Sequence, residues 1–403
     1  MQTTEVYSKA LDKTIEVKRL IGKISGKTSG PVVIFTAGIH GNEPAGVFAL
    51  QKVLADLSRK KAILNGSFYG ISGNLWALKN GKRYKSKDLN RIWTPEYTEL
   101  LERGTLEPTC EDVEEQIALF KEVKNILAEE TGPFYFIDLH TTSGQTIPFA
   151  ILNDSLLNRK FTMQYPVPLV LGIEEYLIGP FLSYINEFGY VAFGYESGQH
   201  DTKKAIDYHE SFIYLTLYFT GIWKDEELFE KHYKALANAG KNFDKFYEIF
   251  YEYKIQNGSN FTMREGFDNF QHIHKNQLLA TERGKDIKAP SKGQVFMPLY
   301  QKLGDDGFFL IRQIPYYFLA ISKMLRKVKF DKILTLLPGV NWQSAKKDTL
   351  IVNRKIARYF ARQLFHLLGY RSKKINRNYL IVKNREAASR NADYNRELWY
   401  KKL

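Results

Sequence analysis

The stretch PVVIFTAGIHGNEP, residues 31–44, sets the architecture of this chain. Its apolar half, which ends at Ala37, has the length of a buried strand, and His40 and Glu43 follow directly. A glycine on either side of His40 permits the tight backbone of a strand-to-helix corner. The closing proline suits the first turn of a helix. The stretch therefore predicts a strand, a polar corner and a helix.

Two later segments repeat this design. The apolar run Phe134 to Ile137 ends in Asp138-Leu139-His140, and Val191 to Tyr195 runs into Glu196. Between the first two runs, residues 111–130 carry apolar side chains at helical spacing. Alternating strands and helices predict an α/β fold with helices on both faces of a sheet. Open sheets of this class place their sites at the carboxyl ends of strands, where all three polar groups fall.

The pattern of apolar and turn-forming residues changes twice after this region. Short β-like runs broken by Gly, Pro and Asn follow, and beyond Pro315 the pattern becomes helical. We expect a catalytic domain over residues 1–250, a small β domain over 251–315 and a basic helical C-terminal extension over 316–403.

Charge is distributed unevenly along the 403 residues. The net charge is +14, but residues 321–403 hold 21 Lys and Arg against 5 Asp and Glu, so the remainder is nearly neutral at −2. A basic amphipathic helix is expected there, beginning at Asp348-Thr349 and ending near Gly369, with Arg354, Arg358 and Arg362 on one side. Docking of its apolar face on the body is favoured. Binding to an anionic partner such as lipid, nucleic acid or an acidic protein stays open.

Bulk features indicate the compartment. A single cysteine, Cys110, cannot form an internal disulfide, which fits a reducing environment. No signal-like start and no long apolar window occur. We expect a globular cytoplasmic protein.

His40, Glu43 and His140 form a ligand pattern of two plus one. Catalytic zinc uses three nitrogen or oxygen ligands and keeps one position open, and two imidazoles with a carboxylate meet that need. Asp138, two residues before His140, could act as an outer hydrogen-bond acceptor. Each residue alone would be an ordinary polar side chain, so the prediction of one zinc ion rests on their combination.

Four motifs in this order resemble the succinylglutamate desuccinylase and aspartoacylase family, which is related to the zinc carboxypeptidases. The match extends from residue 31 to about residue 200, and the stretch 294–310 is similar to the β domain of bacterial members. The resemblance implies a zinc-carboxypeptidase-like mixed sheet. The motifs are His40-Gly41-Asn42-Glu43, Arg83 with Asp88-Leu89-Asn90-Arg91, Asp138-Leu139-His140 and Glu196-Ser197-Gly198.

The resemblance also implies roles for single residues. The metal ligands would be His40, Glu43 and His140. The general base would be Glu196, and Arg83 would polarise the scissile carbonyl. Asn90 and Arg91 would bind a substrate carboxylate, and Tyr300 is the nearest counterpart of a substrate-binding tyrosine.

These observations predict a zinc-dependent hydrolase that cleaves an amide bond in a small carboxylate-bearing substrate, most plausibly an N-acyl amino acid. Where aspartoacylase has an arginine ten residues before the catalytic glutamate, this chain has Asn186, which argues against N-acetylaspartate as the substrate. Two alternatives stay open: a metallocarboxypeptidase acting on peptides, and a non-catalytic anion-binding protein that uses the basic C-terminal region.

Overall fold

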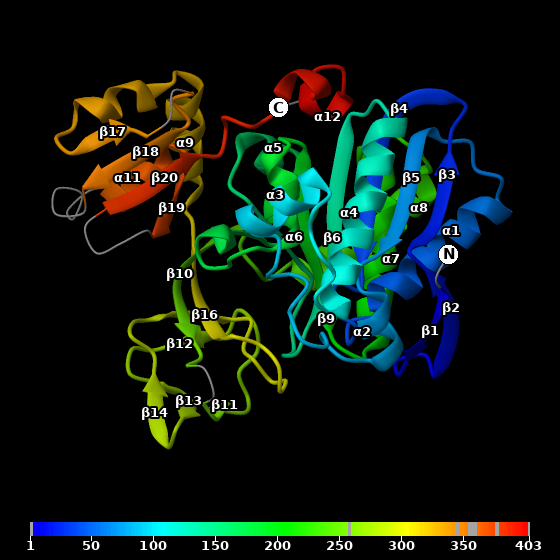
Figure 1. Ribbon diagram of the computed structural model, residues 1–403, viewed down its shortest axis with the longest axis horizontal. Coiled ribbons are helices and arrows are strands. Elements are labelled where there is room, and N and C mark those ends of the chain that lie inside the picture. Colours follow the sequence, from blue (N-terminus) through cyan, green and yellow to red (C-terminus); the bar gives the residue numbers. More distant parts are fainter. Residues whose placement is uncertain (1–2, 257–258, 344–345, 354–360, 375–378, 402–403) are drawn as a thin grey trace.

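The computed structural model describes residues 3–256, 259–343, 346–353, 361–374 and 379–401. Within these residues the largest sheet is mixed and has eleven strands, in the order β12-β15-β16-β10-β8-β7-β9-β6-β4-β5-β3 (Figure 1). Its strands are β3 (Leu20–Ser25), β4 (Thr28–Ala37), β5 (Asn65–Ser72), β6 (Phe134–Thr142), β7 (Phe149–Leu152), β8 (Leu169–Leu171), β9 (Val191–Gln199), β10 (Phe246–Lys254), β12 (His272–Ile273), β15 (Gly293–Phe296) and β16 (Asp306–Gln313).

Helices cover both faces of the sheet because β4 is apolar on both sides. Val33 and Phe35 face one core, and Val32 and Ile34 face the other, as the two-residue period of a strand requires. The first core lies under α1 (Ala45–Arg59), α5 (Leu156–Thr162), α7 (Lys203–Phe219) and α8 (Glu226–Gly240). The second lies under α3 (Pro95–Arg103), α4 (Glu111–Glu129) and α6 (Phe181–Glu187), and α2 (Leu75–Asn80) packs near the end of β4. The predicted fold class and the helix over 111–130 are confirmed.

The region after residue 250 contributes strands to the main sheet and also forms a small sheet of its own. Strands β10, β16, β15 and β12 continue the main sheet, and a small sheet of β11 (Phe261–Met263), β13 (Leu278–Glu282) and β14 (Lys285–Lys288) extends from them. Near the opposite end of the main sheet, β1 (Thr3–Ser8) and β2 (Lys13–Lys18) form a separate two-stranded antiparallel ribbon (Figure 1). The predicted domain boundaries stay a prediction.

The C-terminal extension combines helices with a sheet. It contains α9 (Tyr316–Lys327), η2 (Phe330–Leu336), α11 (Ala361–Leu367) and a four-stranded antiparallel sheet, and it forms the orange lobe of Figure 1. The sheet is made of β17 (Val340–Trp342), β18 (Thr349–Asn353), β20 (Tyr379–Asn384) and β19 (Tyr370–Lys374). Two short helices, η3 (Asn391–Tyr394) and α12 (Leu398–Lys401), follow it.

The predicted helix is therefore wrong over its first part, from Asp348-Thr349, whereas α11 forms its last part and ends before Gly369. Leu350 and Val352 are buried while their neighbours are less so, and this alternation with pairing to β17 and β20 makes the segment a strand. Arg354 and Arg358 lie outside the described residues. The segment pairs with strands that are distant in sequence, which overrides the local helical spacing.

Buried ion pairs attach this extension to the body. Asp154, which follows β7, accepts bonds from Arg326 of α9 at 3.0 Å and Arg371 of β19 at 2.8 Å, and it also pairs with Arg159. None of these four side chains is more than 10% exposed. Among the described residues no helix is long and apolar enough to cross a membrane.

Candidate functional site

The site forms where three parallel strands end together. In the registers of β4, β6 and β9, Ala37 lies beside Leu139, and His140 lies beside Glu196. The corner after β4 requires glycine: a Cβ on Gly41 would lie 1.9 Å from the carbonyl carbon of Ala77. This close approach places α2 and the loop after it against the segment that carries His40.

That loop, residues 81–91, is shaped by a buried carboxylate. Asp112, in the first turn of α4, accepts bonds from the backbone amides of Lys85, Ser86 and Lys87 at 3.2, 2.7 and 2.8 Å. A carboxylate that accepts several backbone N–H groups fixes the path of the chain. The loop thereby brings Arg83 and the segment 88–91 to the site.

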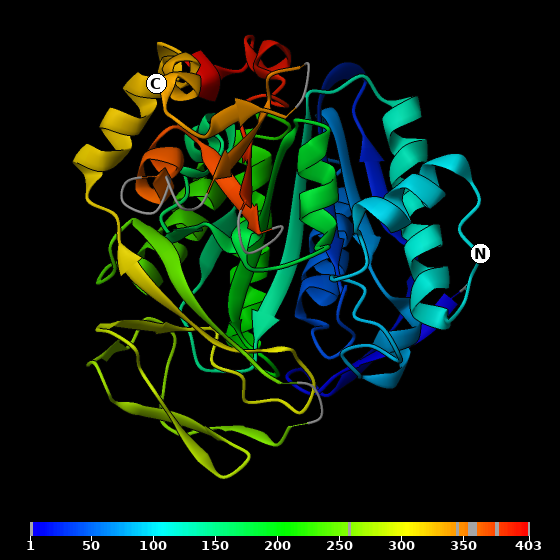
Figure 2. The same cartoon turned by 60° about the vertical axis from the view of Figure 1, so that its left-hand side comes forward.

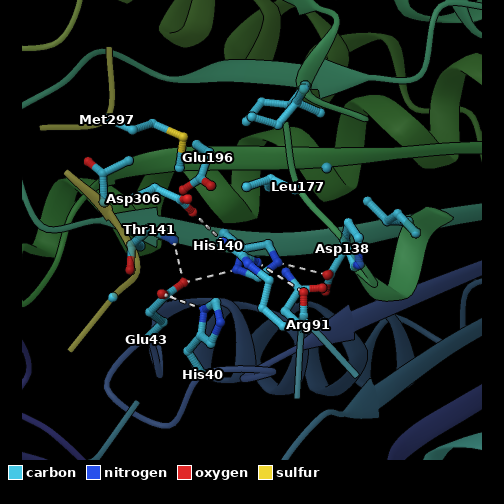
Figure 3. A pocket seen from close by; sticks show the side chains of 18 of the residues that line it. His40, Glu43, Arg91, Asp138, His140, Thr141, Leu177, Glu196, Met297 and Asp306 are labelled. Atoms are coloured by element: carbon cyan, nitrogen blue, oxygen red, sulfur yellow. Dashed lines mark hydrogen bonds and ion pairs between the residues drawn. The ribbon is translucent and has the colours of Figure 1, made fainter. Parts of the chain in front are cut away.

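His40, Glu43 and His140 converge at one point. Their ligand atoms all lie within 4.8 Å of one another, and all three side chains are buried. The two carboxylate oxygens of Glu43 lie 2.8 Å from Nδ1 of His40 and 3.1 Å from Nδ1 of His140. Figure 3 shows Glu43 facing both imidazoles. The three residues that the sequence analysis predicts as metal ligands are therefore adjacent in the structure.

Each imidazole is held from behind by a second carboxylate. Nε2 of His40 lies 3.1 Å from Asp88, and Nε2 of His140 lies 2.7 Å from Asp138. A proton on each Nε2 donates to the carboxylate, which leaves the Nδ1 lone pairs directed at Glu43. Acceptors facing acceptors in a buried space call for a cation between them, so this donor set fits a divalent metal.

The charges around the triad agree with a cation-binding centre. Burial opposes ionisation of Glu43, yet His40 and His140 hold its pKa well below the usual range. Burial also lowers the pKa of His140, but Asp138 and Glu43 outweigh that effect and raise it well above the usual value. The pocket thus favours positive charge at the Nδ1 atoms.

Glu196 lies beside the triad with a free oxygen. It is buried, and its Oε2 has no hydrogen-bond partner among the described residues. Burial raises the pKa of this carboxyl to about 8, an effect that Glu43 and Asp138 reinforce and His140 opposes. A carboxyl with such a pKa can accept and release a proton near neutral pH.

Two arginines reach the same pocket, and both already have carboxylate partners. Arg83 binds Asp88 through Nε at 3.2 Å and Nη2 at 3.0 Å, and its Nη1 lies 3.5 Å from Glu43. Arg91 donates from Nη2 to Asp306 at 2.9 Å. Asn90 also lines the pocket, and its Oδ1 accepts the backbone N–H of Phe181 at 2.9 Å.

Tyr300 is not among the residues that line this pocket. Its hydroxyl lies 2.9 Å from the carbonyl oxygen of Arg264 and 3.1 Å from that of Phe267, and the ring packs in the small β region. The geometry gives the predicted substrate contact of Tyr300 no support. Its neighbour Gln301 lines the pocket instead.

His200, which is not among the site residues predicted from the sequence, also lines the pocket. Its Nδ1 lies 2.7 Å from the hydroxyl of Thr141, and its Nε2 lies 3.4 Å from Oε1 of Gln301. Gln301 in turn accepts from Asn42 at 2.8 Å. The position of His200 four residues after Glu196, at the end of β9, was the available signal.

The pocket itself has a volume of about 150 Å³. Its polar side holds the groups described above, and Asn186 lies on its wall with its amide committed to Leu182 and Asn158. The rest of the wall is mainly apolar, with a few further polar side chains such as Asn153 and Asp305. The larger apolar lining residues are Ile151, Ile173, Leu177, Leu182, Phe193, Met297, Leu299 and Phe309.

Comparison with known proteins gives a consistent result. Residues 29–202 match the family described as Succinylglutamate desuccinylase/Aspartoacylase catalytic domain. The succinylglutamate desuccinylase of Photorhabdus laumondii is 27% identical over 53% of this chain and 69% of its own length. That of Paraburkholderia xenovorans is 29% identical, but the match spans only 27% of this chain and 31% of that relative.

A solved structure supports the fold. The product-bound ectoine utilization protein EutE (DoeB) from Ruegeria pomeroyi superposes with a TM-score of 0.53 at 17% identity, over 77% of this chain and 95% of that one. At this identity the likeness shows the fold, a mixed sheet flanked by helices.

Proposed function

Residues 29–202 are a catalytic domain of the succinylglutamate desuccinylase/aspartoacylase family, to which this chain belongs, and from this premise we propose a zinc-dependent amidohydrolase. Its substrate is a small N-acyl amino acid, from which it releases a carboxylic acid and an amine. The observation that carries the proposal is the convergence of His40, Glu43 and His140 with Glu196 beside them.

His40, Glu43 and His140 would hold the metal. Two Nδ1 atoms and a carboxylate suit Zn²⁺, although cobalt or nickel accept the same ligands. When bound, zinc supplies Lewis acidity, which polarises a carbonyl and lowers the pKa of water from about 15.7 toward about 7. Asp88 and Asp138 hold the two imidazoles in the orientation and tautomer that this requires.

Glu196 acts as the general base in this proposal. It takes a proton from the attacking water as the new carbon–oxygen bond forms, and it returns that proton to the amide nitrogen as the carbon–nitrogen bond breaks. Its buried position and unpartnered Oε2 support this role, because the carboxyl can change its protonation state without losing a protein hydrogen bond.

Arg83 stabilises the oxyanion that develops on the carbonyl. Its two-point contact with Asp88 fixes the guanidinium beside Glu43, so the positive charge is in place before reaction. Asn90 and Arg91 bind the substrate carboxylate. A guanidinium pairs with a carboxylate through two parallel bonds, and Arg91 would then share its charge between Asp306 and the substrate.

The charge balance of the pocket supports a substrate with one carboxylate. Both pocket arginines are already paired with aspartates, and Asn186 replaces the arginine that would hold a second acidic group. Tyr300 has no part in this proposal. N-acetylaspartate and other diacids are expected to be poor substrates.

Metal analysis combined with an acyl-amino-acid panel tests the proposal. The purified protein should contain about one zinc per chain, hydrolyse N-acyl amino acids and lose activity to a chelator. Glu196→Gln should nearly eliminate turnover and leave the metal content unchanged. Hydrolysis of short peptides with free amino termini in preference to N-acyl amino acids would indicate a carboxypeptidase instead. Absence of any hydrolysis by the metal-loaded protein would indicate the anion-binding alternative.

A further inference from the structure

The segment from Tyr316 to Leu337, which contains α9 and η2, turns its apolar side chains toward solvent. Eighteen large apolar side chains are exposed among the described residues, and ten of them lie in this segment. Met324 is 58% exposed and Leu336 is 80% exposed. We call this the α9–η2 surface. Its exposed large apolar residues are Tyr316, Tyr317, Phe318, Ile321, Met324, Val328, Phe330, Ile333, Leu336 and Leu337.

Helix α9 is amphipathic in the reverse of the usual sense. Its buried residues are polar: Ser322 donates to the carbonyl of Leu367 at 2.7 Å, and Arg326 is 1% exposed in the ion pair with Asp154. Residues four apart share a helix face, so this polar pair defines the side that docks on the protein. The opposite side presents Tyr317 and Met324 outward. A surface helix normally does the reverse, and a contiguous apolar patch of this kind marks an interaction surface.

The charges on the α9–η2 surface have a single sign. Lys323, Lys327, Lys329 and Lys332 are exposed among the apolar residues. The one acidic residue in the sequence from 316 to 338 is Asp331, whose carboxylate accepts bonds from the hydroxyl of Tyr370 at 2.8 Å and the amide of Asn384 at 3.2 Å. A two-fold pairing of this surface with a second copy would bring lysines together, whereas an anionic surface would complement them.

A groove beside α9 extends the same combination of groups. It has a volume of about 800 Å³ and runs between α9 and α5, with Met163 and Leu319 among its apolar walls. Lys160, Lys323 and Lys327 line it together. Burial and then the two neighbouring lysines lower the pKa of Lys160, which reflects the concentration of positive charge here. Apolar walls with ammonium groups match an acyl chain that carries an anionic headgroup.

We propose that the α9–η2 surface is a peripheral docking surface for an anionic lipid bilayer. Tyr316, Tyr317, Met324 and Val328 enter the headgroup and acyl boundary, and the lysines contact acidic headgroups. Figure 2 shows α9 at the outer edge of the molecule, where a flat surface can approach it. Aromatic, aliphatic and lysine side chains on one exposed face are the composition of interfacial helices. The chain would therefore work at a membrane surface.

Co-sedimentation of the full chain with vesicles tests this proposal. Wild-type protein should sediment with vesicles that contain phosphatidylserine and stay in solution with phosphatidylcholine alone, and salt should weaken the binding. Lys323→Glu with Lys327→Glu should reduce the partition coefficient by at least about thirtyfold, since each lysine contributes about fivefold. Met324→Ser with Val328→Ser should weaken binding without changing its dependence on acidic lipid.

A matched control uses two lysines elsewhere. Lys285→Glu with Lys288→Glu changes the same charge on exposed residues of β14, far from α9 in Figures 1 and 2, and should leave vesicle binding within about threefold of wild type. Thermal unfolding of every variant checks the fold. The proposal is overturned if wild type does not bind the acidic vesicles or if the α9 variants bind like wild type. It is also overturned if the wild-type protein is a dimer that does not bind vesicles and Met324→Ser with Val328→Ser converts it to a monomer.

Discussion

The carboxylate of Asp138 is expected to set the metal affinity through His140. It lies 2.7 Å from Nε2 of His140, is fully buried, and accepts the hydroxyl of Thr36 at 2.6 Å. Asp138→Asn keeps the shape and an acceptor oxygen, but it converts a charge-assisted bond into a neutral one. Charged hydrogen bonds contribute about 1.5–3 kcal/mol and neutral ones about 0.5–1.5 kcal/mol, so roughly 1–2 kcal/mol is lost.

That loss corresponds to a zinc affinity about 5–30-fold weaker, which overlaps the range of about 10–100-fold found when outer partners of metal ligands are removed. Competition with a chromophoric chelator at fixed pH measures it. Thr36→Val serves as the control, because it removes the hydroxyl and keeps the ion pair, and it should change affinity by less than about threefold. A folded Asp138→Asn protein with wild-type zinc affinity would refute the reasoning, since the imidazole would then need no carboxylate to orient it.

Three further outcomes follow from the structure. Asp154→Asn leaves buried arginines short of a partner and should lower the free energy of unfolding by about 3–5 kcal/mol in a guanidinium titration; an unchanged midpoint would contradict it. Burial lowers the pKa of His232 to about 4, so the folded state keeps this imidazole neutral while the unfolded chain binds a proton below about pH 6.5. Stability should fall between about pH 6.5 and 4, by at most about 3 kcal/mol, and His232→Gln should flatten that slope in pH-dependent melts. Asp306→Asn frees Arg91 and should lower KM for diacid substrates, by up to about tenfold with little change in kcat; a fall in kcat alone would mean that Asp306 acts elsewhere.

The periodic spacing of apolar residues along the sequence was enough to predict several strands and helices and the place where the site residues meet. The apolar run to Ala37, the helix over 111–130 and the approach of His140 to His40 follow from strand and helix periods, because parallel strands bring their carboxyl ends to one edge. These features hold in the structure.

The remaining features depend on contacts between distant segments. The apolar residues around Leu350 are spaced as in a helix, and only the pairing of this segment with β17 and β20 shows that it is a strand. The hydrogen bond from Nε2 of His40 to Asp88 depends on how Asp112 folds the loop between α2 and α3, which no short motif reveals. The outward apolar face of α9 was equally hidden, since its spacing resembles that of any amphipathic helix, and only the packing of Arg326 shows which side is inside.

The C-terminal end of the chain returns to the main sheet, which has a consequence for its biogenesis. Trp399 donates to the hydroxyl of Tyr135 at 2.9 Å, and the hydroxyl of Tyr394 bonds to backbone groups of Phe134 and Val191. Both aromatic rings are buried in the core that also contains α1 and α7. A ribosome must therefore polymerise 260 further residues after Phe134 before Tyr394 can close this face. Until then the nascent domain exposes the apolar surface on which these two aromatic rings pack.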